Sequence, residues 1–134
     1  MQDPKIQTVQ EIYEAFGRGD AEAFFACLTD DVDWATEAAD TTAAPWFGSF
    51  VGKERVGTWL EEIAKASEVA EFTPLTVAAN DTDVLAVVKL AYTVRATGKS
   101  TVTHQHHWYR FRDGKVCYYR GSEDTARTAW LLTP

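Results

Sequence analysis

The sequence has few cysteines, no long hydrophobic run and fewer basic than acidic side chains. Its two cysteines, Cys27 and Cys117, are too few for a disulfide scaffold, so we expect a reducing, cytoplasmic location. No apolar run reaches the roughly 18 to 20 residues that span a bilayer, and the first ten residues lack a secretory apolar core, so neither membrane insertion nor export is expected. The net charge of -7 disfavours nucleic acid and anionic lipid as partners. Without a glycine-rich phosphate-binding motif, no cofactor is expected.

Aromatic side chains are abundant by contrast. Five Trp, five Tyr and seven Phe in 134 residues exceed what a core of this size needs, which indicates an aromatic pocket or interface. The length and the 46% hydrophobic content fit one globular domain over residues 1–134.

Hydrophobic periodicity predicts three helices in the first half of the chain. Apolar residues recur at intervals of three and four residues over 5–17 and 53–67. Asp20 can cap a short helix between these two ranges. Residues 30–37 alternate as a half-buried strand does, with Val32, Trp34 and Thr36 on one face. We interpret residues 37–52 as a loop whose Trp46, Phe47 and Phe50 either form a lid or pack over the edge of the core.

The second half of the chain is rich in strand-forming residues. Strands are predicted over 69–79, 84–96, 101–111 and 115–123, with hairpin signals between them. This order predicts an α+β fold in which three N-terminal helices pack on a strongly curved antiparallel sheet.

Four segments in this order resemble the SnoaL-like proteins of the nuclear transport factor 2-like superfamily, which includes ketosteroid isomerase. They are IYEAFGRGD at 12–20, LTDDVDW at 28–34, GKE at 52–54 and YRFRDGKV at 109–116. The resemblance implies a cone-shaped, cystatin-like shell around a hydrophobic cavity, commonly in a homodimer. It does not fix the function, because one fold hosts many chemistries.

The resemblance also argues against steroid isomerisation. The isomerase's tyrosine donor falls on Ile12, and its general-base aspartate falls on Thr36, which has no useful basicity at neutral pH. Its second oxyanion donor falls on His107, which can donate or accept a hydrogen bond and change charge near neutral pH.

If His107 faces the cavity, strand alternation sends Thr103, Gln105 and Tyr109 inward with it. On the preceding strand Val88, Leu90, Tyr92 and Val94 then also face inward. The outward side chains of these strands and the last one form a polar and aromatic face through which we expect a homodimer. Its members are His104, His106, Trp108, Tyr118 and Arg120.

The register of the last hairpin has two candidates. A three-residue turn at 112–114 pairs His107 with Tyr119 and turns Tyr119 and Glu123 inward, whereas a two-residue turn at 113–114 pairs His107 with Arg120. We favour the first, because an unpaired guanidinium in an apolar cavity is costly.

The side chains predicted to face inward define the candidate site. His107 and Glu123 are the predicted catalytic pair, on the expectation that a nearby carboxylate makes the histidine more basic. Glu37, one residue after the position of the isomerase's general base, is an alternative carboxylate for the site. The predicted substrate-binding residues are Trp34, Thr36, Trp59, Tyr92, Gln105, Tyr109 and Tyr119.

No metal site is expected, because His104 and His106 lack an evident third ligand. The favoured function is acid–base catalysis without a cofactor on a small hydrophobic carbonyl compound, of the isomerase, cyclase or lyase type. The alternatives are a binding module without turnover and an assembly partner with a filled interior.

Overall fold

The computed structural model describes residues 2–134 and has four helices and six strands over that range. Within it no helix is long and apolar enough to cross a membrane. The elements in chain order are α1 Pro4–Arg18, α2 Ala21–Ala26, β1 Leu28–Thr36, β2 Gly48–Val51, α3 Lys53–Ala66, β3 Ser67–Ala79, β4 Asp83–Val94, β5 Ser100–Arg112, β6 Lys115–Ser122 and α4 Thr125–Leu132.

The first helix begins and ends within one residue of the predicted range, and the second begins where Asp20 can cap it. The Asp3 carboxylate accepts a hydrogen bond from the Lys5 amide at the start of α1, and Asp20 accepts one from the Ala23 amide at the start of α2. Between them Gly19 adopts φ 69°, a left-handed conformation that ends α1 and favours glycine. This turn brings α2 back against α1.

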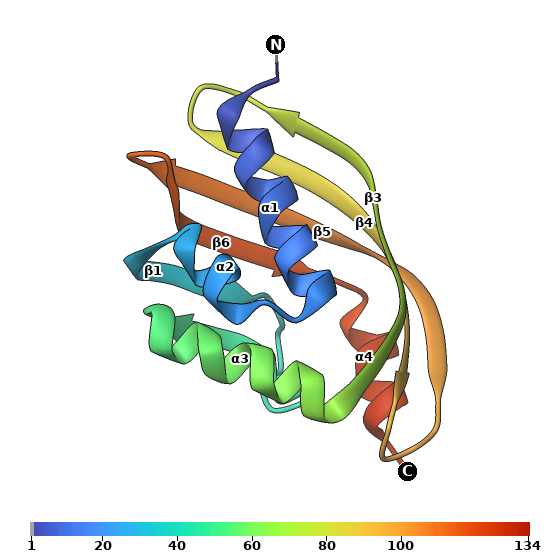
Figure 1. Ribbon diagram of the computed structural model, residues 1–134. Helices are drawn as coiled ribbons and strands as arrows, with labels where there is room; N and C mark the ends of the chain where they lie inside the picture. The colour runs from blue at the N-terminus through green and yellow to red at the C-terminus, as the bar shows by residue number, and fades with distance from the viewer. Residues whose placement is uncertain (1) are drawn as a thin grey trace.

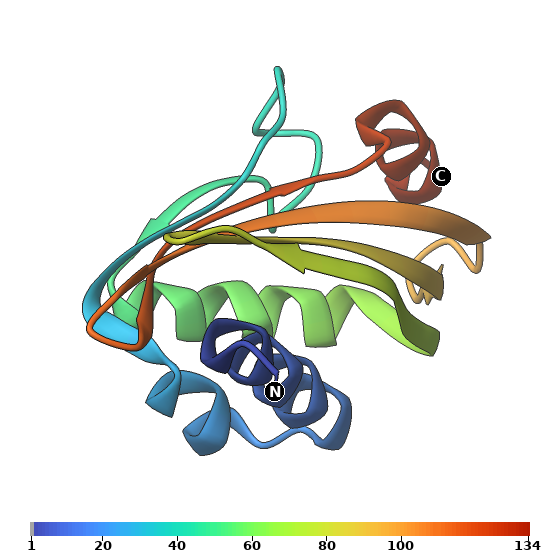
Figure 2. The same ribbon diagram turned by 90° about the horizontal axis from the view of Figure 1, so that it is seen from above.

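The six strands form one open, mixed sheet in the order β2-β1-β6-β5-β4-β3. The prediction of a purely antiparallel sheet is wrong between the second and third strands, where β1 and β6 run parallel. The helices α1, α2 and α3 lie on one side of the sheet, and β3, β4 and β5 bend along their length (Figures 1 and 2). The predicted α+β class is therefore correct.

Two elements were not predicted. The segment treated as a loop over 37–52 contains β2, which pairs with β1. The C-terminal residues form α4, so the described chain has a fourth helix beyond the three expected. α4 lies beside the far ends of β4 and β5 (Figure 1). There Leu131 packs with Leu90, Tyr92 and Val94, and Thr97 in the β4–β5 turn donates to the Leu131 carbonyl.

The β5–β6 hairpin combines features of both predicted registers. The turn has two residues, Asp113 and Gly114, both with positive φ, so the favoured three-residue turn is wrong. A bulge then inserts Cys117, and His107 pairs with Gly121 instead of with Tyr119 or Arg120. Because of this inserted residue, the side chains of β6 that face inward are those expected from the favoured register.

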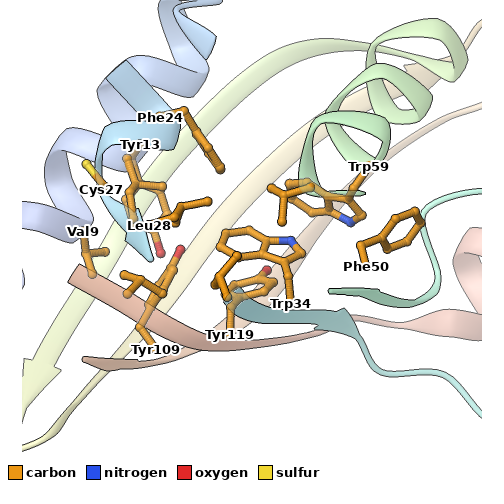
Figure 3. Packing of buried hydrophobic residues seen from close by; sticks show 14 of the residues in the cluster. Val9, Tyr13, Phe24, Cys27, Leu28, Trp34, Phe50, Trp59, Tyr109 and Tyr119 are labelled. Carbon is orange, nitrogen blue, oxygen red and sulfur yellow. The ribbon is translucent and has the colours of Figure 1, made fainter. Parts of the chain in front are cut away.

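The core lies between the helices and the inward face of the sheet and is mostly aromatic. Figure 3 shows Trp34 between Trp59 of α3 and Tyr119 of β6. The Trp34 and Tyr119 rings stack with centroids 3.9 Å apart, and Trp59 meets Trp34 edge-on at 5.2 Å. These rings form one wall of a pocket.

Candidate functional site

A pocket lies between α1, α3 and the inward face of the sheet. Its cavity of about 70 Å³ is small beside the roughly 300 to 1,000 Å³ of sites for drug-sized ligands. Without movement of its lining it therefore suits a ligand of few atoms, and the interior is not completely filled. Every residue predicted for the site lines this pocket: His107, Glu123, Trp34, Thr36, Trp59, Tyr92, Gln105, Tyr109 and Tyr119.

Strand alternation brings these residues together as predicted. Along β5 the side chains of His107 and Tyr109 are buried and that of Gln105 is half-buried, whereas His104 and His106 are exposed. On β4 the alternate residues Leu90 and Tyr92 are buried and also line the pocket. The alternative carboxylate of Glu37 is exposed and lies outside the pocket lining.

The polar groups of the pocket form one hydrogen-bonded chain. The Tyr13 hydroxyl lies 2.7 Å from His107 Nδ1, and His107 Nε2 lies 3.1 Å from Gln105 Oε1. Gln105 Nε2 donates to Glu123 Oε1 at 3.2 Å. Thr128 of α4 donates to the other carboxylate oxygen of Glu123. The chain thus runs from α1 across β5 to the segment between β6 and α4.

Tyr13 is the site residue that the sequence reasoning missed. The isomerase's donor position aligns with Ile12, which led to the expectation that no tyrosine on the first helix serves the site. The structure instead places the next residue, Tyr13, in the pocket lining, with its hydroxyl on His107. Its place in the apolar stripe of residues 5–17 already indicated that it faces inward.

His107 is a neutral imidazole at neutral pH, contrary to the prediction that a carboxylate makes it more basic. Burial disfavours the imidazolium and, with a smaller contribution from His106, lowers the pKa of His107 to about 3. Gln105 stands between the imidazole and Glu123, so no carboxylate contacts His107 directly. His107 can therefore donate and accept hydrogen bonds but is too weak a base to collect a proton near pH 7.

Glu123 is the titratable group of the pocket. Burial raises the pKa of its carboxyl, opposed by hydrogen bonds from Thr128, Trp46 and Gln105. No Lys or Arg is among the described residues that line the pocket, so no cation offsets the desolvation of Glu123. A carboxylate in this environment is a stronger base than one in water.

The aromatic wall also carries polar groups. Trp59 Nε1 donates to the Thr36 hydroxyl at 3.3 Å, whereas Trp34 Nε1 has no hydrogen-bond partner within the described chain. Tyr119 extends over Gly121, where a Cβ would lie only 2.3 Å from the tyrosine hydroxyl. Any side chain at position 121 would therefore displace Tyr119.

The aromatic residues of the 37–52 segment are buried. Trp46, Phe47 and Phe50 are each at most 7% exposed, and Trp46 lines the pocket. Residues 2–134 contain no group of three or more His, Cys, Asp or Glu side chains that could hold a metal ion.

The outward face of the sheet has a different character. Asp83 accepts hydrogen bonds from Arg110 Nε at 2.9 Å and from Trp108 Nε1 at 2.8 Å. The Arg120 guanidinium lies 4.1 Å from the centroid of the Tyr118 ring and bridges to Asp33. Charged and aromatic side chains thus alternate on this face, as the strand pattern predicts.

Solved structures share this fold across nearly the full chain. An NTF2-like protein of unknown function from Burkholderia pseudomallei is 24% identical, with 99% of this chain and 100% of that one covered and a TM-score of 0.89. A candidate polyketide cyclase from Xanthomonas campestris pv. campestris is 20% identical, with 97% of each chain covered and a TM-score of 0.77. An LEH-like epoxide hydrolase from M. tuberculosis is 19% identical, covering 96% and 89%, with a TM-score of 0.72.

At these identities the structures establish the fold alone. Among proteins with curated descriptions none matches the sequence. The SnoaL-like domain family matches residues 9–119, which include most of the pocket lining. The chain therefore belongs to the SnoaL-like domain family, and its fold is similar to that of NTF2-like proteins.

Proposed function

We propose that the protein is a cofactor-independent acid–base enzyme of the isomerase, cyclase or lyase type, with Glu123 as the base. The observation that carries this proposal is the half-buried carboxylate of Glu123, which lines an aromatic pocket and has no cation beside it. Such a carboxylate can take a proton from a carbon next to a carbonyl group and return it elsewhere on the molecule. The similar folds of a candidate polyketide cyclase and an LEH-like epoxide hydrolase support an enzyme of this broad kind.

The substrate that fits best is a small, uncharged carbonyl compound. An anionic ligand is disfavoured, because it would bring a second negative charge near Glu123 with no Lys or Arg in the lining. The cavity of about 70 Å³ disfavours polycyclic molecules such as steroids. In this role His107 remains neutral and helps to order the hydrogen-bonded chain, instead of acting as the base.

Deuterium exchange tests the proposal. Cyclopentanone and 2-cyclopentenone in D2O are suitable probes, since loss of their α-proton NMR signals reports proton abstraction directly. We expect the native protein to accelerate exchange and Glu123→Gln to lose about 10²- to 10⁴-fold of that acceleration. The rate should rise with pH as Glu123 ionises, with no second change from His107 between pH 5 and 8.

Glu37→Gln is the matched control, because Glu37 is exposed and outside the pocket lining. Equal exchange rates in the native protein and Glu123→Gln would contradict the assignment of Glu123. Saturation-transfer signals from a bound probe without any exchange would instead support the alternative of a binding module without turnover.

We also propose that the outward face forms a homodimer in the cytoplasm. The exposed apolar side chains Leu85 and Val102 lie on this face, and Leu85 is paired with Trp108. A groove of about 340 Å³, lined by Leu85 and Trp108, runs along the face. Light scattering should give a mass near twice the 15.0 kDa of one chain, and Leu85→Lys with Trp108→Lys should halve it. A monomeric native protein would contradict this proposal.

A further inference from the structure

The hydrogen-bonded chain of the pocket has a consistent direction when Glu123 is ionised. A carboxylate only accepts hydrogen bonds, so the Gln105 amide must turn its NH2 group toward Glu123 and its oxygen toward His107. His107 then carries its proton on Nε2 and donates it to Gln105. Nδ1 is left as an acceptor for the Tyr13 hydroxyl. Every donor along the chain points toward the carboxylate.

Protonation of Glu123 permits the opposite direction. The Thr128 hydroxyl can donate either to Oε2 of Glu123 or to the Asp124 carbonyl. While Thr128 donates to Oε2, the proton of Glu123 lies on Oε1 and faces Gln105. If the amide rotates by half a turn, its oxygen accepts this proton and its NH2 group donates to His107 Nε2. The imidazole then carries its single proton on Nδ1 and donates it to the Tyr13 oxygen. The ring loses one proton to water and gains one from water, so its charge does not change.

The reversal frees the Tyr13 hydroxyl proton. The Tyr13 oxygen then accepts from His107, and its own O–H can turn into the pocket that Tyr13 lines. Mixed arrangements are costly, because they set two donors or two acceptors face to face among buried groups. The chain therefore has two complete arrangements, and the second forms only when Glu123 is protonated.

We propose that Gln105 and His107 form a hydrogen-bond switch through which the protonation state of Glu123 sets the direction of the Tyr13 hydroxyl. This inference rests on the proposed function for its use in catalysis. When Glu123 has taken a proton from the substrate, negative charge develops on the carbonyl oxygen. Tyr13 becomes a donor in that same state and can stabilise the charge.

The titratable groups that face Glu123 and His107 do not oppose this switch. Glu123 is surrounded by Tyr92, Tyr119 and Asp124, and Asp124 disfavours its ionisation as burial does. His107 faces the rings of Tyr13, Tyr109 and Tyr119, with His106 as its neighbour on β5. Burial raises the pKa of each of these four tyrosines, so they stay protonated near neutral pH.

Nitrogen NMR of the histidine tests the switch without any substrate. Long-range ¹H–¹⁵N correlations distinguish an Nε2–H from an Nδ1–H imidazole, and a His104→Gln/His106→Gln background leaves His107 as the sole histidine. Between pH 4 and 9 we expect Nε2–H at high pH and Nδ1–H at low pH. The midpoint should equal that of the Glu123 carboxyl carbon, followed in the same sample by ¹³C shifts.

Gln105→Leu removes the bridging amide and should uncouple the two titrations, so that Glu123 still titrates while the His107 tautomer stays constant. Gln10→Leu, at an exposed position on α1, should leave them coupled. A single tautomer across the native titration, or an unchanged tautomer switch in Gln105→Leu, would overturn the proposal. If Gln105→Leu does not fold, coincidence of the two native midpoints still decides.

The switch and the proposed function can fail separately. Loss of the tautomer change with normal α-proton exchange would leave Glu123 as the base but remove the role of Gln105. Normal switching with no exchange in any probe would keep the coupling and argue against catalysis on ketones.

Discussion

The two faces of the sheet hold carboxylates in opposite electrostatic states. On the outward face Asp83 is paired with Arg110 and accepts from Trp108, which lowers its pKa to about 2. On the inward side Glu123 has only neutral donors, and burial raises the pKa of its carboxyl. A cation within reach, more than the number of hydrogen bonds, thus decides whether the pKa of a carboxyl in this fold is lowered or raised.

The largest expected effect is on stability, and it compares a tryptophan in the packed interior with one on the surface. Trp34→Ala removes a ring that is 1% exposed and stacked on Tyr119, and should lower the free energy of unfolding by about 3 to 5 kcal/mol. Trp130→Ala, at a ring that is 48% exposed, should cost less than about 1 kcal/mol. Urea unfolding followed by circular dichroism measures both, and similar losses would contradict the packing described for Trp34.

The next effect concerns the neutral histidine. Because the pKa of His107 is about 3 in the folded state and near 6.5 in an unfolded chain, the unfolded state binds the extra proton more tightly between these values. Stability should therefore fall as the pH drops through this window, by up to about 1.4 kcal/mol per pH unit from this group. His107→Gln should flatten that part of the curve and the exposed His104→Gln should not. Identical slopes for the native protein and His107→Gln would mean that His107 is solvated.

The smallest effect compares the two carboxylates directly and has opposite signs. Asp83→Asn should destabilise the protein by about 1 kcal/mol at pH 7, and Asp83's contribution in the native protein should disappear as the pH falls from 3.8 through 2. Glu123 has a raised pKa, so its ionisation weakens the fold as the pH rises above 4.5. The stability of Glu123→Gln relative to the native protein should therefore increase with pH. Slopes of the same sign would remove the contrast between the faces.

The sequence predicted the inward and outward directions better than it predicted the pairing. Which side chains of β5 face inward follows from strand alternation alone, so the inward directions of Gln105, His107 and Tyr109 were predictable. The pairing of His107 with Gly121 was not, because it depends on a two-residue turn and a bulge at Cys117 whose effects on the register partly cancel. The parallel contact of β1 with β6 and the presence of α4 depend likewise on tertiary packing.

Which residues line the site was easier to predict than how acidic or basic those residues are. His107 and Glu123 line the same pocket, but the expected direct contact is absent. The amide of Gln105 between them and the depth of burial decide the basicity of the imidazole. Neither is visible in strand alternation. Tyr13 was missed because a one-residue difference in helix alignment hides which side chain reaches across to the sheet.

The parallel pairing of β1 and β6 has a consequence for biosynthesis. Leu28 pairs with Val116, and the contact between β1 and β6 therefore forms only after most of the chain has left the ribosome. Until then β1 has an unpaired edge, and the aromatic residues destined for the pocket remain open to water. The edge of β1 is therefore open to non-native pairing until the last strand is translated.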